Sequence, residues 1–193
     1  MMNSTLNEAR RWFGMWLRNP RHIASLAPSS AALAQLMAKR VPLKSGQIVV
    51  ELGAGTGAVT HALLHAGVAL PNLIVIERDA QLVSLLRARF PGAEVIHGDA
   101  AQLQRLLLDR NITSVACIVS SLPLLTLPIR TRVAILRASF ALLGEQGELI
   151  QYTYSPFSPI TVRMLRRMGL YGCRIGHIWR NVPPATVWAF REY

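Results

Sequence analysis

Short apolar runs alternate along the chain with longer stretches in which apolar positions recur at helical spacing. The runs predict strands, and the spacing predicts helices between them. We expect strands over residues 47–52, 72–77, 93–96, 115–120, 147–153, 171–179 and 184–191. We expect helices over residues 5–18, 28–40, 58–66, 80–89, 100–108, 129–143 and 158–168. This alternation is typical of a doubly wound α/β fold with a mostly parallel, seven-stranded sheet.

Residues that start or stop helices mark several of these boundaries. Asn19 and Pro20 end the first helix, and Ser29 or Ser30 can cap the second. Gly144 is the expected C-cap of the helix before it, because glycine readily adopts the left-handed conformation there.

Length and composition favour a single domain. The 193 residues are enough for a full sheet of this kind. The hydrophobic content is 51%, yet no uninterrupted apolar run reaches the ~18 residues of a membrane span. Arg10, Arg11 and Arg18 interrupt the apolar residues near the start, so we expect no signal peptide. Cys117 and Cys173 fall in expected strands, which predicts reduced core residues of a cytoplasmic protein.

The formal net charge is +11, which indicates an anionic partner, either nucleic acid or an acidic membrane surface. The basic residues concentrate at the two ends of the chain. Residues 1–40 hold six Lys or Arg and one acid, and residues 160–193 hold six Arg and one acid.

The expected helix over residues 5–18 is amphipathic. Its apolar face covers an arc of about 140° at 100° per residue, and it comprises Leu6, Ala9, Trp12, Phe13, Trp16 and Leu17. Arg10, Arg11 and Arg18 lie on the other side. Aromatic residues opposite arginines are typical of a helix in a membrane interface. The alternative is a helix packed on the domain with its arginines in water.

A glycine loop stands between an expected strand and an expected helix. Residues 51–57 read Glu-Leu-Gly-Ala-Gly-Thr-Gly. Glycines let the backbone turn tightly and let a nucleotide-like ligand approach closely. The spacing is G-x-G-x-G rather than the dinucleotide G-x-G-x-x-G. It resembles motif I of the class I S-adenosylmethionine (SAM) methyltransferases.

Two acids follow at the ends of the next two expected strands. Glu77 comes about 20 residues after the loop, where a carboxylate can bind both ribose hydroxyls in a βαβ nucleotide site. Asp99 lies in a turn after the third strand, and in class I methyltransferases an acid there binds the adenine amino group. Asp99 can also cap the helix that begins at Ala100. For Glu77, a solvated strand end is the alternative.

The ends of the fourth and fifth strands are expected at the same edge of the sheet as the glycine loop. Residues 120–125 read Ser-Ser-Leu-Pro-Leu-Leu, where amino-group methyltransferases often carry an Asn/Asp-Pro-Pro-Tyr type motif. No aromatic follows Pro123, which counts against the base stacking that nucleic-acid methylation usually needs. Tyr152 and Tyr154 lie in a proline-rich segment at the next strand end. Ordinary turns and packing are the alternatives for both segments.

The histidines do not predict a metal site. His61 and His65 have i, i+4 spacing, but no third ligand is evident, so we interpret them as surface or packed residues. His97 precedes the adenine-site acid and lines the expected pocket.

The pattern as a whole resembles the bacterial phospholipid N-methyltransferases, whose SAM core is similar to that of the rRNA adenine dimethylases. The resemblance spans nearly the whole chain and rests on residues 16–20, 27–30, 50–57, 98–100, 120–124, 151–156 and 180–185. The Ser-x-Leu-Pro-Leu-Leu, Gln-x-Thr-Tyr and Asn-x-Pro-Pro-Ala segments are its specific parts. Ser121 departs from it, because glycine is expected there and a larger residue could narrow the amine site.

The resemblance implies a division of the chain and a set of site residues. Residues 1–20 form a membrane-interacting amphipathic helix, and residues 21–193 form the methyltransferase domain. The expected cofactor-binding residues are Glu51, Gly53, Ala54, Gly55, Thr56, Gly57, Glu77, Arg78, Gly98, Asp99, Ala100 and Ser120. The expected catalytic residues are Tyr154, Tyr152 and Ser120. The expected lipid-binding residues are Ser121, Leu122, Pro123, Arg180, Asn181, Arg18 and Arg21, and the expected membrane contacts are Leu6, Trp12, Phe13, Trp16, Leu17, Arg10 and Arg11.

The implied activity is stepwise methylation of phosphatidylethanolamine and its methylated forms toward phosphatidylcholine, with S-adenosylhomocysteine as the second product. The implied enzyme is a monomer on the inner face of the cytoplasmic membrane, bound to anionic lipids and needing neither metal nor nucleic acid. Two alternatives stay open at this point. One is an RNA or DNA adenine N6-methyltransferase, and the other is a non-catalytic membrane-binding protein on a SAM fold.

Overall fold

The computed structural model describes residues 28–42, 46–179, 181 and 183–193. Its seven-stranded sheet has the order β3-β2-β1-β4-β5-β7-β6. The strands are β1 (Val49–Leu52), β2 (Leu73–Glu77), β3 (Glu94–His97), β4 (Val115–Ser120), β5 (Leu143–Thr153), β6 (Leu170–Ile178) and β7 (Ala185–Glu192). β7 runs antiparallel to both of its neighbours, and the pairings among β1 to β5 are parallel. The predicted doubly wound, mostly parallel sheet is confirmed.

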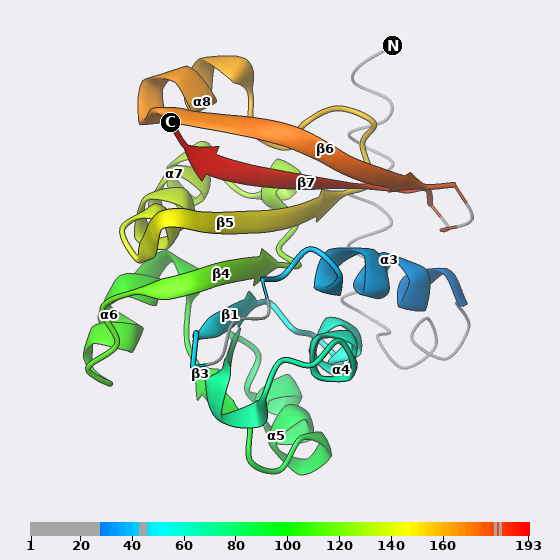
Figure 1. Cartoon of the computed structure of the whole chain (residues 1–193), viewed down its shortest axis with the longest axis vertical. Helices are drawn as coiled ribbons and strands as arrows, with labels where there is room; N and C mark the ends of the chain where they lie inside the picture. Colours follow the sequence, from blue (N-terminus) through cyan, green and yellow to red (C-terminus); the bar gives the residue numbers. More distant parts are fainter. Residues whose placement is uncertain (1–27, 43–45, 180, 182) are drawn as a thin grey trace.

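Helices cover both faces of the sheet (Figure 1). One face packs against α3 (Pro28–Ala38), α4 (Ala58–His65) and α5 (Ala80–Arg89). The other packs against α6 (Leu103–Leu108), α7 (Ile129–Phe140) and α8 (Val162–Met168). Short 3-10 turns are η1 (Leu70–Asn72), η2 (Ala100–Gln102) and η3 (Leu124–Thr126). Successive strand residues point to opposite faces, so Val49 belongs to the first core and Val50 to the second.

The expected C-cap at Gly144 is wrong. Helix α7 ends at Phe140 with Ala141 as its C-cap, and Gly144 lies inside β5. The strand begins earlier than expected because Leu143 pairs with Val115 of β4. Pairing with a buried neighbour therefore overrides the local preference of glycine for a helix end.

Three further expectations are corrected. The helix predicted over residues 158–168 begins only after Thr161, whose hydroxyl accepts a backbone hydrogen bond from the first turn of α8. The helix predicted over residues 100–108 is divided into η2 and α6. Cys117 is buried in β4, but Cys173 is exposed because β6 is the edge strand.

The predicted helix over residues 5–18, and with it the proposed division at residue 20, lies outside the described residues. Within the described residues, no helix is both long and apolar enough to cross a membrane.

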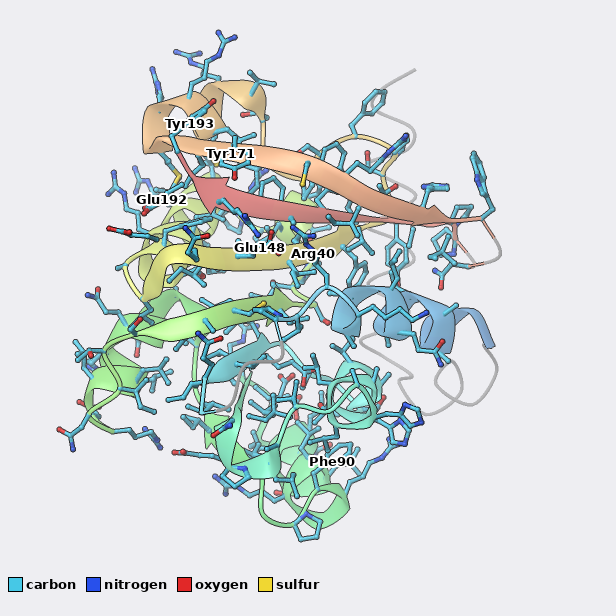
Figure 2. All side chains as sticks on the ribbon, viewed as in Figure 1. Arg40, Phe90, Glu148, Tyr171, Glu192 and Tyr193 are labelled. Carbon is cyan, nitrogen blue, oxygen red and sulfur yellow. The ribbon has the colours of Figure 1, made fainter. Side chains whose placement is uncertain are left out.

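An ion cluster around a buried carboxylate joins three separate segments (Figure 2). Glu148 of β5 is 3% exposed and accepts hydrogen bonds from the guanidinium groups of Arg40, which follows α3, and Arg191 of β7. The Arg191 Nη2 atom lies 2.6 Å from Glu148 Oε1. Glu148 is thus a fully paired buried charge, which is the condition under which such a group is tolerated in a core.

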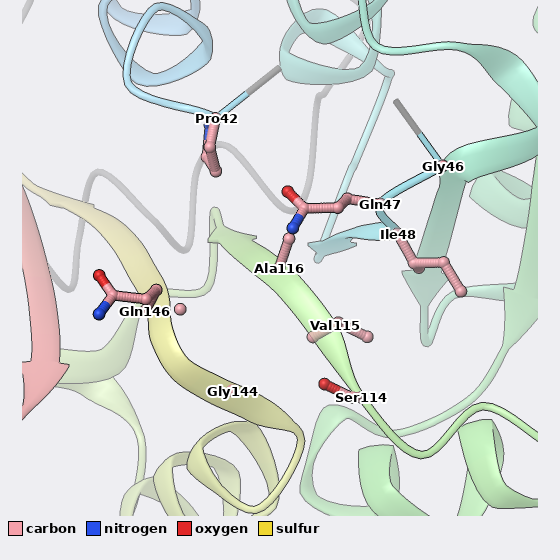
Figure 3. A pocket seen from close by; sticks show the side chains of 10 residues that line it. Pro42, Gly46, Gln47, Ile48, Ser114, Val115, Ala116, Gly144 and Gln146 are labelled. Carbon is pink, nitrogen blue, oxygen red and sulfur yellow. The ribbon is translucent and has the colours of Figure 1, made fainter. Parts of the chain in front are cut away.

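A pocket of about 330 Å³ opens at the edge of the sheet where β1, β4 and β5 begin (Figure 3). Its lining includes Gln47, Ser114, Ala116, Gly144 and Gln146. The glycine loop and the strand ends with the candidate residues lie at the opposite edge, so this pocket is separate from the candidate site.

Candidate cofactor and acceptor site

The glycine loop connects the end of β1 to the start of α4. Gly53, Gly55 and Gly57 all have positive φ angles, of 70°, 57° and 87°, which residues with a Cβ rarely adopt. The Gly53 amide donates to Ile76 O of β2 at 2.8 Å, so the loop is held against the neighbouring strand. The N-cap of α4 is Gly57, which has no side chain to accept from the N–H groups of the first helical turn.

Glu77 closes this loop from the end of β2. Its Oε2 accepts the Gly55 amide at 2.9 Å, and its Oε1 accepts the amides of Arg78 and Asp79 at 2.8 and 3.0 Å. The side chain is largely buried. A carboxylate has about four lone-pair sites, so Glu77 fixes the loop and keeps acceptor capacity for a hydroxyl group.

Glu51 lies beneath the loop in β1 and is fully buried. Its Oε2 accepts the Thr60 hydroxyl at 2.6 Å, while Oε1 finds no hydrogen-bond partner among the described residues. Burial raises the pKa of Glu51 to about 7, the Thr60 hydrogen bonds oppose this rise, and the charge of Glu77 adds to it. An unpartnered buried carboxylate oxygen beside a glycine loop fits a cationic ligand such as SAM, which carries an ammonium and a sulfonium.

Asp99 follows the end of β3 and is the N-cap of η2. Its Oδ1 accepts the Ala101 amide at 2.9 Å and so begins η2. Gly98 before it donates its amide to Glu77 O at 3.0 Å, which keeps this turn beside the end of β2. His97 is exposed, and its Nε2 lies 3.0 Å from Arg78 O. The capping alternative for Asp99 is therefore observed, and its contact with adenine stays a prediction.

The segment after β4 packs directly on the glycine loop. The Ser121 amide donates to Leu52 O of β1 at 2.9 Å. A Cβ added to Gly53 would lie 2.7 Å from Leu122 Cδ2, so a larger residue there would displace Leu122. Ser120 is buried, and the buried hydroxyl of Ser121 has no partner within the described part of the chain. The glycine loop and the segment after β4 are thus packed against each other.

Gln151 of β5 begins the Gln-x-Thr-Tyr segment and lies beside the candidate site, although sequence reasoning assigned it no role. It is fully buried, and its Nε2 donates to Leu122 O at 2.9 Å and to Tyr152 O at 2.6 Å. These two carbonyl acceptors fix the orientation of the amide. Its Oε1 is buried without a partner in the described residues. The signal in the sequence was a polar residue in an otherwise apolar strand end, which is unusual unless it is hydrogen-bonded.

The two tyrosines lie side by side at the end of β5. The ring centroids of Tyr152 and Tyr154 are 5.4 Å apart at an interplanar angle of 70°. Burial raises the pKa of Tyr152 well above its usual value, and Tyr154 adds to this rise; burial also raises the pKa of Tyr154. Both hydroxyls therefore stay protonated at neutral pH. Tyr154 is 37% exposed, so it is the one of the pair that solvent or a substrate reaches more easily.

Several predicted site residues are not part of this cluster. Asn181 is buried in the turn between β6 and β7, and its Nδ2 donates to Pro183 O at 2.6 Å. The remaining lipid and membrane candidates lie outside the described residues: Leu6, Arg10, Arg11, Trp12, Phe13, Trp16, Leu17, Arg18, Arg21 and Arg180.

Metal-ligand clustering is not found in the described part of the chain, where no group of three or more His, Cys, Asp or Glu side chains is arranged to hold an ion. His61 and His65 stack with ring centroids 6.4 Å apart.

Comparison with known proteins shows which family the chain belongs to. No protein-family model matches the chain. The ornithine lipid N-methyltransferase of Singulisphaera acidiphila is 31% identical over 185 residues, which cover 93% of this chain and 94% of that enzyme. The chain belongs to the family of this lipid N-methyltransferase.

More distant relatives share the core. The ribosomal RNA small subunit methyltransferase A of Thermotoga neapolitana is 28% identical over 137 residues, or 69% of this chain and 49% of that protein. That of Laribacter hongkongensis is 47% identical over 62 residues, or 31% of this chain and 22% of that protein. The chain thus spans about half or less of the length of these two rRNA enzymes. The expected likeness to rRNA methyltransferases is confirmed over the matched residues.

Solved structures share the fold of the family. A TehB-like SAM-dependent methyltransferase from Corynebacterium glutamicum superposes with a TM-score of 0.64 at 18% identity, covering 97% of this chain and 99% of that one. The 1,6-didemethyltoxoflavin N1-methyltransferase of Burkholderia thailandensis, solved with S-adenosylhomocysteine, gives 0.65 at 12% identity, covering 100% and 90%. The protein has the class I SAM-dependent methyltransferase fold, and SAM is its cofactor.

Replacing Glu51 with glutamine should remove a pH dependence of stability. The folded state keeps a proton on Glu51 up to a pKa of about 7, whereas the unfolded chain releases it near 4.5. The free energy of unfolding of the wild type should therefore fall as the pH rises through this window, by up to about 3 kcal/mol relative to Glu51→Gln. Denaturant unfolding without cofactor at both ends of the window measures this difference.

Glu145→Gln is the matched control, because it makes the same substitution at an exposed position of β5. A constant difference in stability between the wild type and Glu51→Gln across the window would contradict a buried, protonated Glu51.

Replacing Gln151 with methionine should loosen the acceptor segment. The change keeps the volume but removes the donor to two carbonyls, which should cost about 1–3 kcal/mol of unfolding free energy. Methyl transfer should slow more than SAM affinity falls, because Gln151 contacts the segment after β4 directly and the glycine loop only through Leu122. Unfolding, SAM titration and turnover should be compared with Gln146→Met, an exposed glutamine of the same strand. Equal stability and turnover in the two variants would refute this role.

Proposed function

We propose that this protein transfers methyl groups from SAM to the amine nitrogen of a membrane lipid head group. The observation that carries this proposal is the 31% identity to an ornithine lipid N-methyltransferase over 94% of that enzyme's length. The arrangement of the candidate site supports it. Neutral hydroxyls and carbonyls lie at the ends of β4 and β5. Such groups suit an uncharged amine whose lone pair is directed at the cofactor.

The proposed acceptor is the head-group amine of a membrane lipid. The resemblance to phospholipid N-methyltransferases favours phosphatidylethanolamine and its mono- and dimethylated forms, with phosphatidylcholine as the end product. The relative from Singulisphaera favours an ornithine lipid. Both lipids present the same chemistry to the enzyme, which is an amine at the depth of the head groups.

Binding and positioning account for most of the proposed mechanism. SAM supplies an electrophilic methyl group on a sulfonium when it is bound. The glycine loop, Glu51, Glu77 and Asp99 would hold the cofactor, and the segment after β4 would hold the amine. Fixing two reactants at near-attack distance can supply several kcal/mol of the barrier reduction, out of an upper range of about 7–11 kcal/mol.

The head-group ammonium must lose a proton, because only the neutral amine has a lone pair that can attack the methyl group. Because burial raises the pKa of Tyr154, we propose that its neutral hydroxyl accepts a hydrogen bond from the amine and relays the proton to water. Tyr152 supports the ring of Tyr154 from the side, and Ser120 lies buried at the end of β4. An aromatic face also attracts methylated ammonium groups as the reaction proceeds.

The enzyme is proposed to work as a monomer on the inner face of the cytoplasmic membrane. The net charge of +11 supports attraction to anionic lipids. The amphipathic pattern over residues 5–18 supports a contact with the interface, and Arg18, Arg21 and Arg180 remain candidates for a lipid phosphate.

RNA adenine methylation is the second candidate, because rRNA methyltransferases match part of the chain. No aromatic follows Pro123 in the sequence, so the segment after β4 lacks the ring on which a flipped base would stack.

Methyl transfer should be tested with labelled SAM and three acceptors. Liposomes with phosphatidylethanolamine, liposomes with ornithine lipid, and ribosomal RNA should be incubated separately with the full chain, followed by lipid extraction. Label is expected in a lipid amine and absent from RNA. The more strongly labelled lipid identifies the substrate, and label in RNA alone would overturn the proposal.

Replacing Tyr154 with phenylalanine should slow turnover by about 10²-fold, because it removes the hydroxyl that relays the proton and keeps the ring. SAM affinity should change little, since Glu77 is the last residue of β2 and Tyr154 follows β5, with β1 and β4 between these two strands. Steady-state kinetics and calorimetry measure the two effects. Wild-type turnover would transfer the role to Tyr152 or to water, and lost SAM affinity would place Tyr154 in the cofactor pocket.

A further inference from the structure

Two large apolar side chains project into solvent at the edge of the sheet that carries the candidate site. Phe157 is 72% exposed and Trp179 is 79% exposed. Phe157 lies in the connection from β5 to α8, and Trp179 directly follows β6. β5 and β6 both run antiparallel to β7, so their ends meet at the same edge, toward which their arrowheads point in Figure 1.

The segment that presents Phe157 is built to be stiff. The amides of Ser155 and Phe157 donate to the hydroxyls of Thr153 and Ser155, each at 3.1 Å. The Ile160 amide donates to the Ser158 hydroxyl at 3.2 Å. Prolines precede Phe157 and follow Ser158 in the sequence. Hydroxyl-bonded turns and prolines reduce the freedom of the backbone, so the backbone that carries the exposed ring is restrained.

The turn that presents Trp179 is also supported. The rings of His177 and Trp179 pack edge to face with centroids 4.2 Å apart. His177 Nδ1 lies 2.7 Å from the Thr186 hydroxyl of β7. The Asn181 amide donates to Ile178 O at 3.3 Å. The Trp179 ring and the backbone of Phe157 are therefore pre-positioned, which lowers the entropy lost when the two residues bind a surface.

We propose that Phe157 and Trp179 form a docking surface that inserts into the interface of an anionic bilayer and turns the candidate site toward it. The inference rests on the proposed function, because a lipid amine is reached only if this edge faces the head groups. Tryptophan and phenylalanine are the residues that bury well at this depth. The net charge of +11 complements an anionic surface.

The test uses the full chain and the double variant Phe157→Ser/Trp179→Ser. Tyr193→Ser is the matched control, because Tyr193 is an aromatic that is 88% exposed but lies at the opposite end of β7 (Figure 2). Co-sedimentation with vesicles of phosphatidylcholine and phosphatidylglycerol measures docking without any acceptor amine. The double variant should bind these vesicles about tenfold more weakly or worse, and the control should bind like the wild type. Thermal unfolding and SAM titration verify that both variants fold.

Turnover provides the second readout. With phosphatidylethanolamine or ornithine lipid in vesicles, the double variant should lose activity in proportion to its lost binding. With a water-soluble short-chain form of the same lipid, it should keep wild-type turnover. If the wild type labels no lipid amine, the proposed function fails, while the vesicle-binding result still decides the docking surface.

Vesicle affinity equal to that of the control would overturn the proposal and assign membrane contact to another segment, such as the predicted helix over residues 5–18. A change from dimer to monomer in gel filtration, with unchanged vesicle affinity, would overturn it in favour of a contact between two copies of the chain.

Discussion

The parallel pairing of β1 with β4 is the constraint on which the site depends. From β1 the chain builds outward through β2 and β3, and it then returns to lay β4 against the other side of β1. The exits of β1 and β4 therefore lie side by side, joined by the hydrogen bond from the Ser121 amide to Leu52 O. Ligands of open α/β sheets bind at such a reversal of strand order, because the connections diverge to opposite faces and leave a crevice.

Close packing at this reversal of strand order connects the glycine loop with the segment after β4. Gly53 has no side chain, and the space that a Cβ would need is filled by Leu122. The carbonyl of Leu122 in turn accepts the Gln151 amide from β5. The glycine loop, the segment after β4 and β5 are thus held in one arrangement by core packing. Under the proposed function, this packing would set the distance between the two reactants.

Three buried polar side chains of the sheet differ in how completely they are hydrogen-bonded. Glu148 is paired with Arg40 and Arg191, as expected of a charge whose role is structural. Glu51 and Gln151 each retain a buried oxygen for which the described residues offer no partner. An unmade hydrogen bond in a core is costly. Buried polar atoms without a partner in the described residues also occur away from the candidate site, as at Gln47, so a ligand role for Glu51 and Gln151 rests on their position at the carboxyl ends of β1 and β5.

Local sequence determined the strands, most helices and the glycine loop. Apolar runs are long enough to mark buried parallel strands, and the glycines of residues 53–57 permit backbone angles closed to other residues. It also indicated Glu77 and Asp99, because strand ends in a βαβ unit have a fixed relation to the loop. The resemblance of the later segments placed the chain in its family, which the relative from Singulisphaera bears out.

Tertiary structure alone decided the remaining features. The extension of β5 back to Leu143, the role of Gln151 and the contact of Leu122 with Gly53 all depend on partners that are distant in the sequence. The same holds for Phe157 and Trp179, which share an edge of the sheet only because β7 runs antiparallel between β5 and β6. Hydrophobic periodicity specifies which residues are buried, but it does not specify which strands become neighbours, since any apolar strand can pair with any other.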